Sequence, residues 1–263
     1  GPSPHYGRSG AMRVAEWWVR TAKRLRRHVI ADAGIEAEVL LRHAMDMGRA
    51  DFFAALDDQL ATPQKELADR LLQRRMAGEP LAYILGNREF YGLDFCVNPS
   101  VLIPRQESEL LIDAVLEHYK EKPDQEPMIV DVGTGSGAIA IAIASRLPRA
   151  AIYATDSSHE ALLVADVNRQ RHSVTDRVHL LQCDLLEALR EPVDVIVSNP
   201  PYLTTEELAR AQPEIRSEPP QALDGGKDGL DITRRLLRQA RSHLRPEGLM
   251  VVEIAPQQVG PAM

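Results

Sequence analysis

Five short apolar runs that alternate with helical patterns constrain the fold of this 263-residue chain more than any other feature. In each run, apolar residues follow one another and do not alternate with polar ones. Most of the segments between the runs are apolar on one helical face only. This combination is typical of parallel strands that helices cover on both faces. We therefore expect an α/β fold with an open, mostly parallel sheet. The expected strands are Met128–Val132, Ala151–Thr155, Val178–Gln182, Val193–Ser198 and Leu249–Ile254.

The N-terminal third of the chain follows another pattern. Apolar residues three or four positions apart over residues 12–77 predict a small bundle of helices. Over residues 88–103, apolar and polar residues alternate around a turn, which predicts a hairpin with apolar residues 101–103 continuing it. The expected division is a helical bundle over 11–85, a hairpin linker over 86–104 and the α/β domain over 105–263.

Composition excludes several functional classes. The net charge of −7 weighs against a protein that mainly coats nucleic acid, because that task depends on neutralising phosphates. Residues 1–10 lack the apolar segment of a signal peptide and are left out of the fold argument. Cys96 and Cys183 lie far apart, and the histidines show no ligand spacing. We expect reduced thiols, no metal site, no membrane span and a cytoplasmic location.

The segment DVGTGSGAIA, residues 131–140, directly follows the first predicted strand of the α/β region. Its glycines allow a tight turn and a close approach of the backbone to a ligand, and the following helix start offers free N–H groups. Asp156 ends the next strand, where a carboxylate suits ribose hydroxyls. Asp184 follows the third strand, where its carboxylate or the neighbouring backbone suits an adenine edge. These features predict a nucleotide-type cofactor.

Two cofactors compete for this loop. Gly133, Gly135 and Ala138 satisfy the dinucleotide pattern G-x-G-x-x-[GA], so NAD stays an alternative. Asp131 favours another ligand, because a carboxylate at the strand end is poorly placed for a pyrophosphate but suits the ammonium group of an amino-acid-like ligand. The pattern D-x-G-x-G-x-G resembles the S-adenosylmethionine motif of Rossmann-like methyltransferases.

The fourth predicted strand ends on Asn-Pro-Pro-Tyr, residues 199–202, at the same edge of the sheet as the glycine loop. Neither proline has an N–H, so this stiff backbone offers carbonyl acceptors only. The Asn199 side-chain oxygen and the Pro200 carbonyl can each accept one hydrogen of a planar NH2 group, on which Tyr202 can stack. Such positioning turns the delocalised nitrogen lone pair toward a methyl donor.

Asn-Pro-Pro-Tyr behind such a motif resembles enzymes that methylate planar NH2 groups on adenine in DNA, guanine in RNA or glutamine in proteins. Three further segments narrow the resemblance to the release factor glutamine methyltransferases, the HemK/PrmC family. They are EPLAYILGNREFYGLDF (79–95), VLIPRQESELL (101–111) and EPPQALDGGKDGLD (218–231). The resemblance covers about residues 30–255 and includes a helical N-terminal domain.

This resemblance implies transfer of a methyl group from S-adenosylmethionine to the glutamine of the Gly-Gly-Gln motif in peptide chain release factors. It also implies that the helical domain recognises the substrate. Asn199, Pro200 and Tyr202 would be catalytic, and Pro201, Arg105 and Glu107 would join them in holding the substrate. The cofactor residues would be Asp131, Gly133, Thr134, Gly135, Ser136, Gly137, Asp156, Asp184, Leu185 and Asn199.

The sequence departs from the family in two places. Gln106 and Ser108 stand where the family commonly has proline and threonine, and two strands that usually complete the sheet are expected to be absent. The rival functions are methylation of a ribosomal-protein glutamine, methylation of an adenine or guanine amine, and non-catalytic binding of a dinucleotide or S-adenosylmethionine. We expect a monomer whose partner is a release factor, with no stable nucleic-acid partner.

Overall fold

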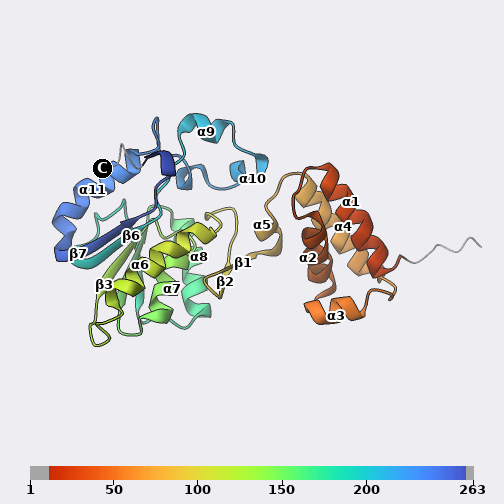
Figure 1. Ribbon diagram of the computed structural model, residues 1–263, viewed down its shortest axis with the longest axis horizontal. Helices are drawn as coiled ribbons and strands as arrows, with labels where there is room; N and C mark the ends of the chain where they lie inside the picture. The colour runs from red at the N-terminus through yellow and green to blue at the C-terminus, as the bar shows by residue number, and fades with distance from the viewer. Residues whose placement is uncertain (1–11, 259–263) are drawn as a thin grey trace, which may run out of the picture. The chain divides into compact units, whose positions relative to one another are not determined.

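The computed structural model describes residues 12–258, and the expectations for residues 1–10 lie outside this range. The chain forms two compact units, the first ending at Leu85 and the second beginning at Gly86 (Figure 1). The sequence therefore changes from a helical period to a strand pattern at the boundary between two separately packed units.

The first unit is helical over its described residues. Its helices are α1 (Val14–Arg27), α2 (Ala33–Met45), α3 (Arg49–Ala54), α4 (Thr62–Met76) and α5 (Leu81–Leu85). Helix α2 packs against both α1 and α4, as Figure 1 shows. The apolar residues at helical spacing form one core, in which Leu25, Leu40 and Phe52 are fully buried.

The second unit begins with the predicted hairpin. Strands β1 (Asn87–Phe90) and β2 (Leu93–Cys96) pair antiparallel, and both residues of the connecting turn, Tyr91 and Gly92, have positive φ. The expected continuation over residues 101–103 is wrong, because this segment is not a strand. It leads instead into a 3-10 turn, η1 (Gln106–Ser108), and helix α6 (Glu109–Tyr119).

A parallel sheet forms the centre of the second unit, with the strand order β5-β4-β3-β6-β7. The predicted α/β fold class is thereby confirmed. The strands are β3 (Met128–Val132), β4 (Ala151–Asp156), β5 (Val178–Gln182), β6 (Val193–Ser198) and β7 (Leu244–Val252). The connecting helices are α7 (Ala138–Arg146), α8 (His159–Arg171), α9 (Thr205–Ala209), α10 (Pro213–Arg216) and α11 (Asp231–His243), with 3-10 turns η2 (Pro220–Ala222) and η3 (Pro256–Gln258).

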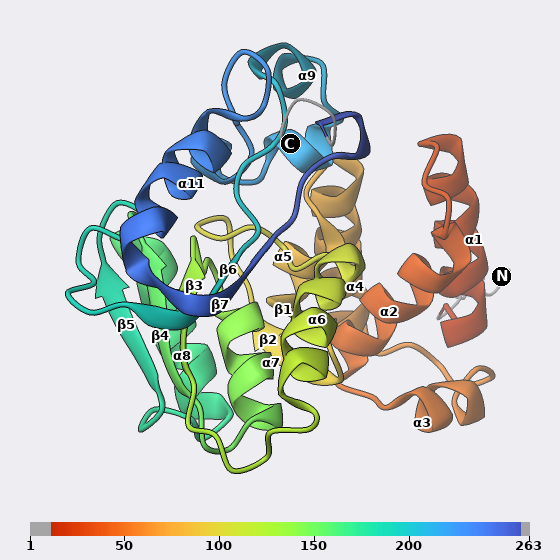
Figure 2. The ribbon, with the colours of Figure 1, turned by 60° about the vertical axis from the view of Figure 1, so that its left-hand side comes forward.

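Alternate side chains of each central strand enter different cores, as the two-residue period of a strand requires. Ile129 joins a core with residues of α6 and α7, which lie side by side in Figure 2. The next residue, Val130, joins a second core with Leu236 of α11. Helices thus cover both faces, so the sheet can present a ligand site only at the ends of its strands.

The last strand differs from its prediction. The expected strand was Leu249–Ile254, whereas β7 begins at Leu244 and ends at Val252. Residues Leu249–Val252 pair in regular register with β6, but the register shifts between Val193 and Val195. This irregularity accommodates Pro246 and Gly248, two residues that sequence patterns associate with a turn. None of the helices within residues 12–258 is long and apolar enough to span a membrane.

Candidate active site

A cleft of about 820 Å³, counting the solvent at its mouth, lies at the carboxyl ends of the parallel strands. Loops that follow β3, β4, β5 and β6 all contribute to it. Eight residues predicted from the sequence line this cleft: Gly133, Gly135, Asp156, Asp184, Leu185, Asn199, Pro200 and Pro201. The sheet topology therefore gathers the predicted cofactor loop and the Asn-Pro-Pro segment around one space.

The glycine loop connects β3 to α7. Gly133, Gly135 and Gly137 have φ of 73°, 55° and 80°, in the left-handed region that favours glycine. A Cβ added to Gly133 or Gly135 would meet no protein atom within 4 Å, so both face open space. A Cβ on Gly137 would lie 3.1 Å from Ile141 and 3.2 Å from Ala165. Gly137 therefore lets α7 pack closely, whereas the first two glycines leave room for a ligand.

Asp131 is buried at the end of β3, with 1% of its surface exposed. Its Oδ2 accepts hydrogen bonds from Thr134 Oγ1 at 2.7 Å and from the Ala140 amide at 3.3 Å. Its Oδ1 has no hydrogen-bond partner within residues 12–258. Burial raises the pKa of Asp131 to about 7. A buried carboxylate oxygen without a donor fits a cationic ligand group, which would restore its charge.

Asp156 ends β4, and its carboxylate holds both the glycine loop and the turn that leads into α8. Its Oδ2 accepts from the Gly135 amide and its Oδ1 from the Ser158 amide, both at 2.9 Å. Burial raises its pKa, and these backbone hydrogen bonds oppose the rise. Each oxygen has a further lone pair, so the carboxylate can also accept from the two hydroxyls of a ribose.

Asp184 lines the cleft but already has a partner. Its carboxylate forms an ion pair with Arg235 of α11. The next residue, Leu185, has a φ of 52°, and its carbonyl accepts from Thr155 Oγ1 at 2.9 Å. The Asp184 side chain therefore attaches α11 to the loop after β5, and the backbone of this loop is held by β4.

Within the Asn-Pro-Pro-Tyr segment, the Asn199 side chain is held by a long-range hydrogen bond: its Nδ2 donates to Ser108 Oγ at 3.0 Å. Ser108 Oγ in turn donates to Glu253 Oε2 at 2.6 Å. Because Nδ2 is engaged, Asn199 Oδ1 and the neighbouring Pro200 carbonyl are left as acceptors. These are the two oxygens that the sequence predicts as acceptors for a planar NH2 group.

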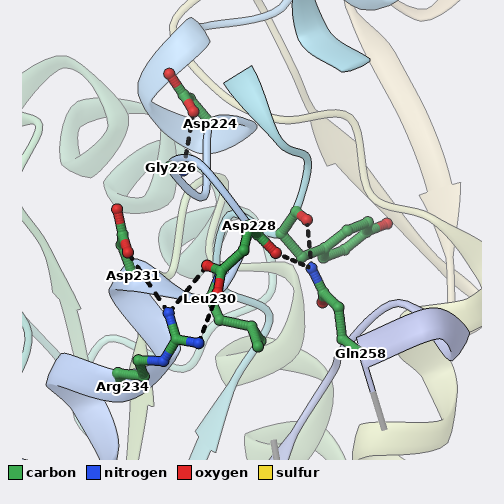
Figure 3. A network of polar contacts seen from close by, with 8 residues as sticks. Asp224, Gly226, Asp228, Leu230, Asp231, Arg234 and Gln258 are labelled. Carbon is green, nitrogen blue, oxygen red and sulfur yellow. Dashed lines mark hydrogen bonds and ion pairs between the residues drawn. The ribbon is translucent and has the colours of Figure 1, made fainter. Parts of the chain in front are cut away.

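Tyr202 is partly buried, and its main chain is fixed by the last described residues. Gln258 Nε2 donates to the Tyr202 carbonyl at 2.9 Å and to the Asp228 carbonyl at 3.3 Å (Figure 3). Gln258 itself is only 4% exposed. Burial and the nearby Glu253 carboxylate raise the pKa of Tyr202, so its hydroxyl remains protonated. Tyr202 does not line the cleft itself, and its side chain lies near the charged groups of Glu253, Arg105 and Glu107.

Arg105 and Glu107 behave differently from one another. Arg105 forms an ion pair with the buried Glu218, whose other oxygen accepts from the Ile103 amide at 2.9 Å. This arrangement joins the segment before η1 to the Glu-Pro-Pro segment at residues 218–220. Glu107 is exposed, and its charge contributes to the raised pKa values of Tyr202 and Glu253.

Some predicted residues support the cleft from behind. Thr134 and Ser136 are buried, and the Ser136 carbonyl accepts from Asn168 Nδ2 at 2.8 Å. With Asp131 and Gly137, they shape the loop and do not line the cleft. The sequence patterns did not single out Glu218, Glu253, Asn168 or Gln258. Glu218 stands in the Glu-Pro-Pro segment and Glu253 in the last predicted strand, but only their long-range partners reveal a role.

The sheet order, the glycine loop and the cleft define a Rossmann-like methyltransferase fold. Residues 106–226 match the family model described as the methyltransferase small domain, and residues 16–86 match the PrmC N-terminal domain. The solved hMettl16 catalytic domain, in complex with MAT2A 3'UTR hairpin 6, is similar with a TM-score of 0.53 and 16% identity, over 65% of each chain. That similarity concerns the fold alone.

Sequence relatives are more specific. A release factor glutamine methyltransferase of Moorella thermoacetica is 47% identical over 225 residues, covering 85% of this chain and 79% of that relative. The protein of the same name from Geobacter sulfurreducens is 39% identical over 245 residues, covering 90% and 84%. This chain belongs to the release factor glutamine methyltransferase family, and the predicted resemblance is confirmed.

Proposed function

We propose that this protein methylates the side-chain amide of the glutamine in the Gly-Gly-Gln motif of a peptide chain release factor. The products are N5-methylglutamine and S-adenosylhomocysteine. The observation that carries the proposal is the oriented Asn199 amide, whose Nδ2 donates to Ser108 and whose oxygen remains as an acceptor beside the cleft. The names of the relatives support the same substrate.

S-adenosylmethionine is the proposed cofactor, and when bound it supplies a methyl group on a sulfonium. The carboxylate of Asp131, buried directly behind the loop with its Oδ1 unpartnered within residues 12–258, would attract the ammonium group by its charge. Asp156 would accept from its ribose hydroxyls, and the open space beside Gly133 and Gly135 would take its amino-acid portion. The ion pair of Asp184 with Arg235 leaves the backbone beside Leu185 to meet the adenine.

The substrate amide is a weak nucleophile because its nitrogen lone pair is delocalised into the carbonyl. Asn199 Oδ1 and the Pro200 carbonyl would each accept one N–H of this amide, while Tyr202 would stack on its plane. Nitrogen gains positive charge as it forms the new bond, and two acceptor oxygens fixed beforehand stabilise that charge. The surplus proton then leaves to water, so these residues act by orientation and electrostatics.

The test is incubation of the protein with a release factor and S-adenosylmethionine, followed by mass spectrometry of the Gly-Gly-Gln peptide. We expect the mass to rise by one CH2 group on the glutamine. Asn199→Ala should abolish the gain, while Asn87→Ala, an exposed asparagine in β1, should retain it. An active protein that methylates DNA, RNA or a ribosomal protein and leaves the release factor unmodified would contradict the proposal.

We also propose that the helical unit contacts the release factor, through the basic surface of α1. Lys23 and Arg27 are exposed and lie one turn apart on this helix. Reversing both charges (Lys23→Glu with Arg27→Glu) should raise KM for the intact release factor by about tenfold. KM for a short Gly-Gly-Gln peptide should not change. The proposed enzyme acts as a monomer in the cytoplasm, where release factors function.

A further inference from the structure

We propose that Glu253 is a positioning residue that sets the orientation of the Asn199 amide through the hydroxyl of Ser108. The inference rests on the proposed function, because it assigns the group that makes Asn199 Oδ1 face the substrate. Three segments meet here: η1 supplies Ser108, the loop after β6 supplies Asn199, and the residue directly after β7 is Glu253.

Two hydrogen bonds connect these residues in a fixed direction. Ser108 Oγ donates to Glu253 Oε2 at 2.6 Å, and Asn199 Nδ2 donates to Ser108 Oγ at 3.0 Å. Ser108 is 3% exposed, so water does not compete freely for its hydroxyl. The Glu253 backbone amide also donates to the Ser198 carbonyl at 3.0 Å, which attaches the glutamate directly to the residue before Asn199.

The direction follows from the donors available. An asparagine amide has nearly the same shape when its oxygen and nitrogen exchange places, so packing alone does not select one orientation. An ionised carboxylate only accepts hydrogen bonds, and a hydroxyl has one hydrogen. Glu253 therefore takes the hydrogen of Ser108, and the serine oxygen can only accept from Asn199.

The reversed amide would place Asn199 Oδ1 against the Ser108 oxygen, with no hydrogen between them. Two acceptors in contact repel, and the amide nitrogen would then face the substrate NH2 as a second donor. The carboxylate of Glu253 thus excludes the orientation that cannot bind a planar NH2 group. Its effect on the orientation of Asn199 passes through Ser108.

Protonation of Glu253 would remove this selection. A neutral carboxyl can donate to Ser108 Oγ, which frees the serine hydrogen to satisfy a reversed Asn199 oxygen. Glu253 is partly buried, and burial raises its pKa, as does the charge of Glu107, while the Ser108 hydrogen bond and Arg105 lower it. The hydroxyl of Tyr202 adjoins it from the loop after β6 and also lowers its pKa. Methyl transfer should therefore lose rate as the pH falls through the Glu253 pKa.

The first test compares variants of the full chain with a release factor as substrate. Ser108→Ala removes the acceptor of Asn199 and should lower kcat by about thirtyfold, because a small misorientation at a reacting group is costly. Ser108→Thr keeps the hydroxyl, so its kcat should stay within about threefold of that of the unchanged protein. Equal kcat for Ser108→Ala and the unchanged protein would overturn the inference.

The second test concerns the carboxylate. Glu253→Gln keeps the size of the side chain but can donate as well as accept, so kcat should fall by about tenfold and the acidic limb of the pH profile should disappear. Adding Glu253→Gln to Ser108→Ala should lower kcat no further, because both changes break one chain of hydrogen bonds. If the two changes lowered kcat by independent factors that multiply in the double variant, action of Glu253 through Ser108 would be contradicted. Glu247→Gln, which changes an exposed glutamate within β7, is the control and should show neither effect.

A third measurement does not depend on activity. In the ligand-free protein, the ¹⁵N side-chain resonance of Asn199, identified by its loss in Asn199→Ala, should shift with pH as Glu253 titrates. The shift should vanish in Glu253→Gln and in Ser108→Ala. A titration that persists in both variants overturns the inference. No methyl transfer by the unchanged protein would instead contradict the proposed function, and this resonance would still test the orientation of Asn199.

Discussion

Asp131 shows how one buried oxygen can connect cofactor binding to pH. Its Oδ1 has no partner within the described chain, and burial raises its pKa to about 7. The ligand-free protein therefore holds an extra proton on this carboxyl below pH 7. A cationic ligand group favours the ionised form, so binding below pH 7 must release that proton.

The affinity for S-adenosylhomocysteine, which keeps the ammonium group, should therefore increase with pH and level off above about pH 7. Because one proton is linked to binding, Kd should be about tenfold weaker at pH 6 than at pH 8. Isothermal titration calorimetry across this range measures both the affinity and the released proton. Asp131→Asn should bind weakly with little pH dependence, and an unchanged profile in this variant would contradict the assignment.

The same shift has the opposite sign for folding. The folded-state pKa of Asp131 lies above its ordinary value of 3.8, so the native state binds more protons than the unfolded state between these values. The contribution of this group to stability is therefore full below that window and declines as pH rises toward 7. Urea unfolding at pH 5 and pH 8 should show a smaller pH-dependent loss of stability in Asp131→Asn than in the unchanged protein.

At the scale of elements, α8 connects the hairpin to the glycine loop. Asn168 is fully buried on α8, and its Oδ1 accepts from the Cys96 amide at 2.7 Å. Its Nδ2 donates to the carbonyls of Cys96 at 2.9 Å and Ser136 at 2.8 Å. One side chain therefore satisfies three backbone groups from β2 and from the turn before α7.

Asn168→Ala leaves these groups without partners and should lower the free energy of unfolding by about 3 kcal/mol. Since the Ser136 carbonyl belongs to the glycine loop, the affinity for S-adenosylhomocysteine should fall as well. Chemical denaturation and calorimetry measure the two effects. Gln170→Ala, exposed on the same helix, should change stability by less than about 0.5 kcal/mol, and an equal loss in both variants would contradict this explanation.

At the scale of the molecule, all residues that line the cleft belong to the unit that begins at Gly86. The hydrophobic cores of the units are separate: Leu40 is buried in that of the first, and Ile129 and Val130 in the two cores of the second. Ligand binding should therefore stabilise only one of the two bodies, because only a state that binds gains free energy from the ligand.

Differential scanning calorimetry should resolve two transitions. S-adenosylhomocysteine at about 100 times its Kd should stabilise the second unit by about 2.7 kcal/mol and leave the first unchanged. Leu40→Ala, at a fully buried position of α2, should lower the stability of the first unit by about 3 kcal/mol. The transition of the second unit should not change. A single transition that both changes shift together would show that the units unfold as one.

The sequence by itself determined the elements that depend on local pattern. The five strands, the glycine loop and the Asn-Pro-Pro-Tyr ending follow from apolar period and from the backbone limits of glycine and proline, and four strands lie within a residue of their predicted bounds. Parallel pairing then brought the predicted residues to one edge. The last strand was misplaced because a register shift is decided by its partner β6.

Only the tertiary structure decided how the site residues are held. Ser108 contacts Glu253 across 145 positions of sequence, Asn199 contacts Ser108 across 91, and Arg105 contacts Glu218 across 113. No local period encodes such pairs, because a hydrogen bond between distant segments depends on where the whole chain places their backbones. The sequence therefore predicted which groups do the chemistry, and folding chose the partners that hold them.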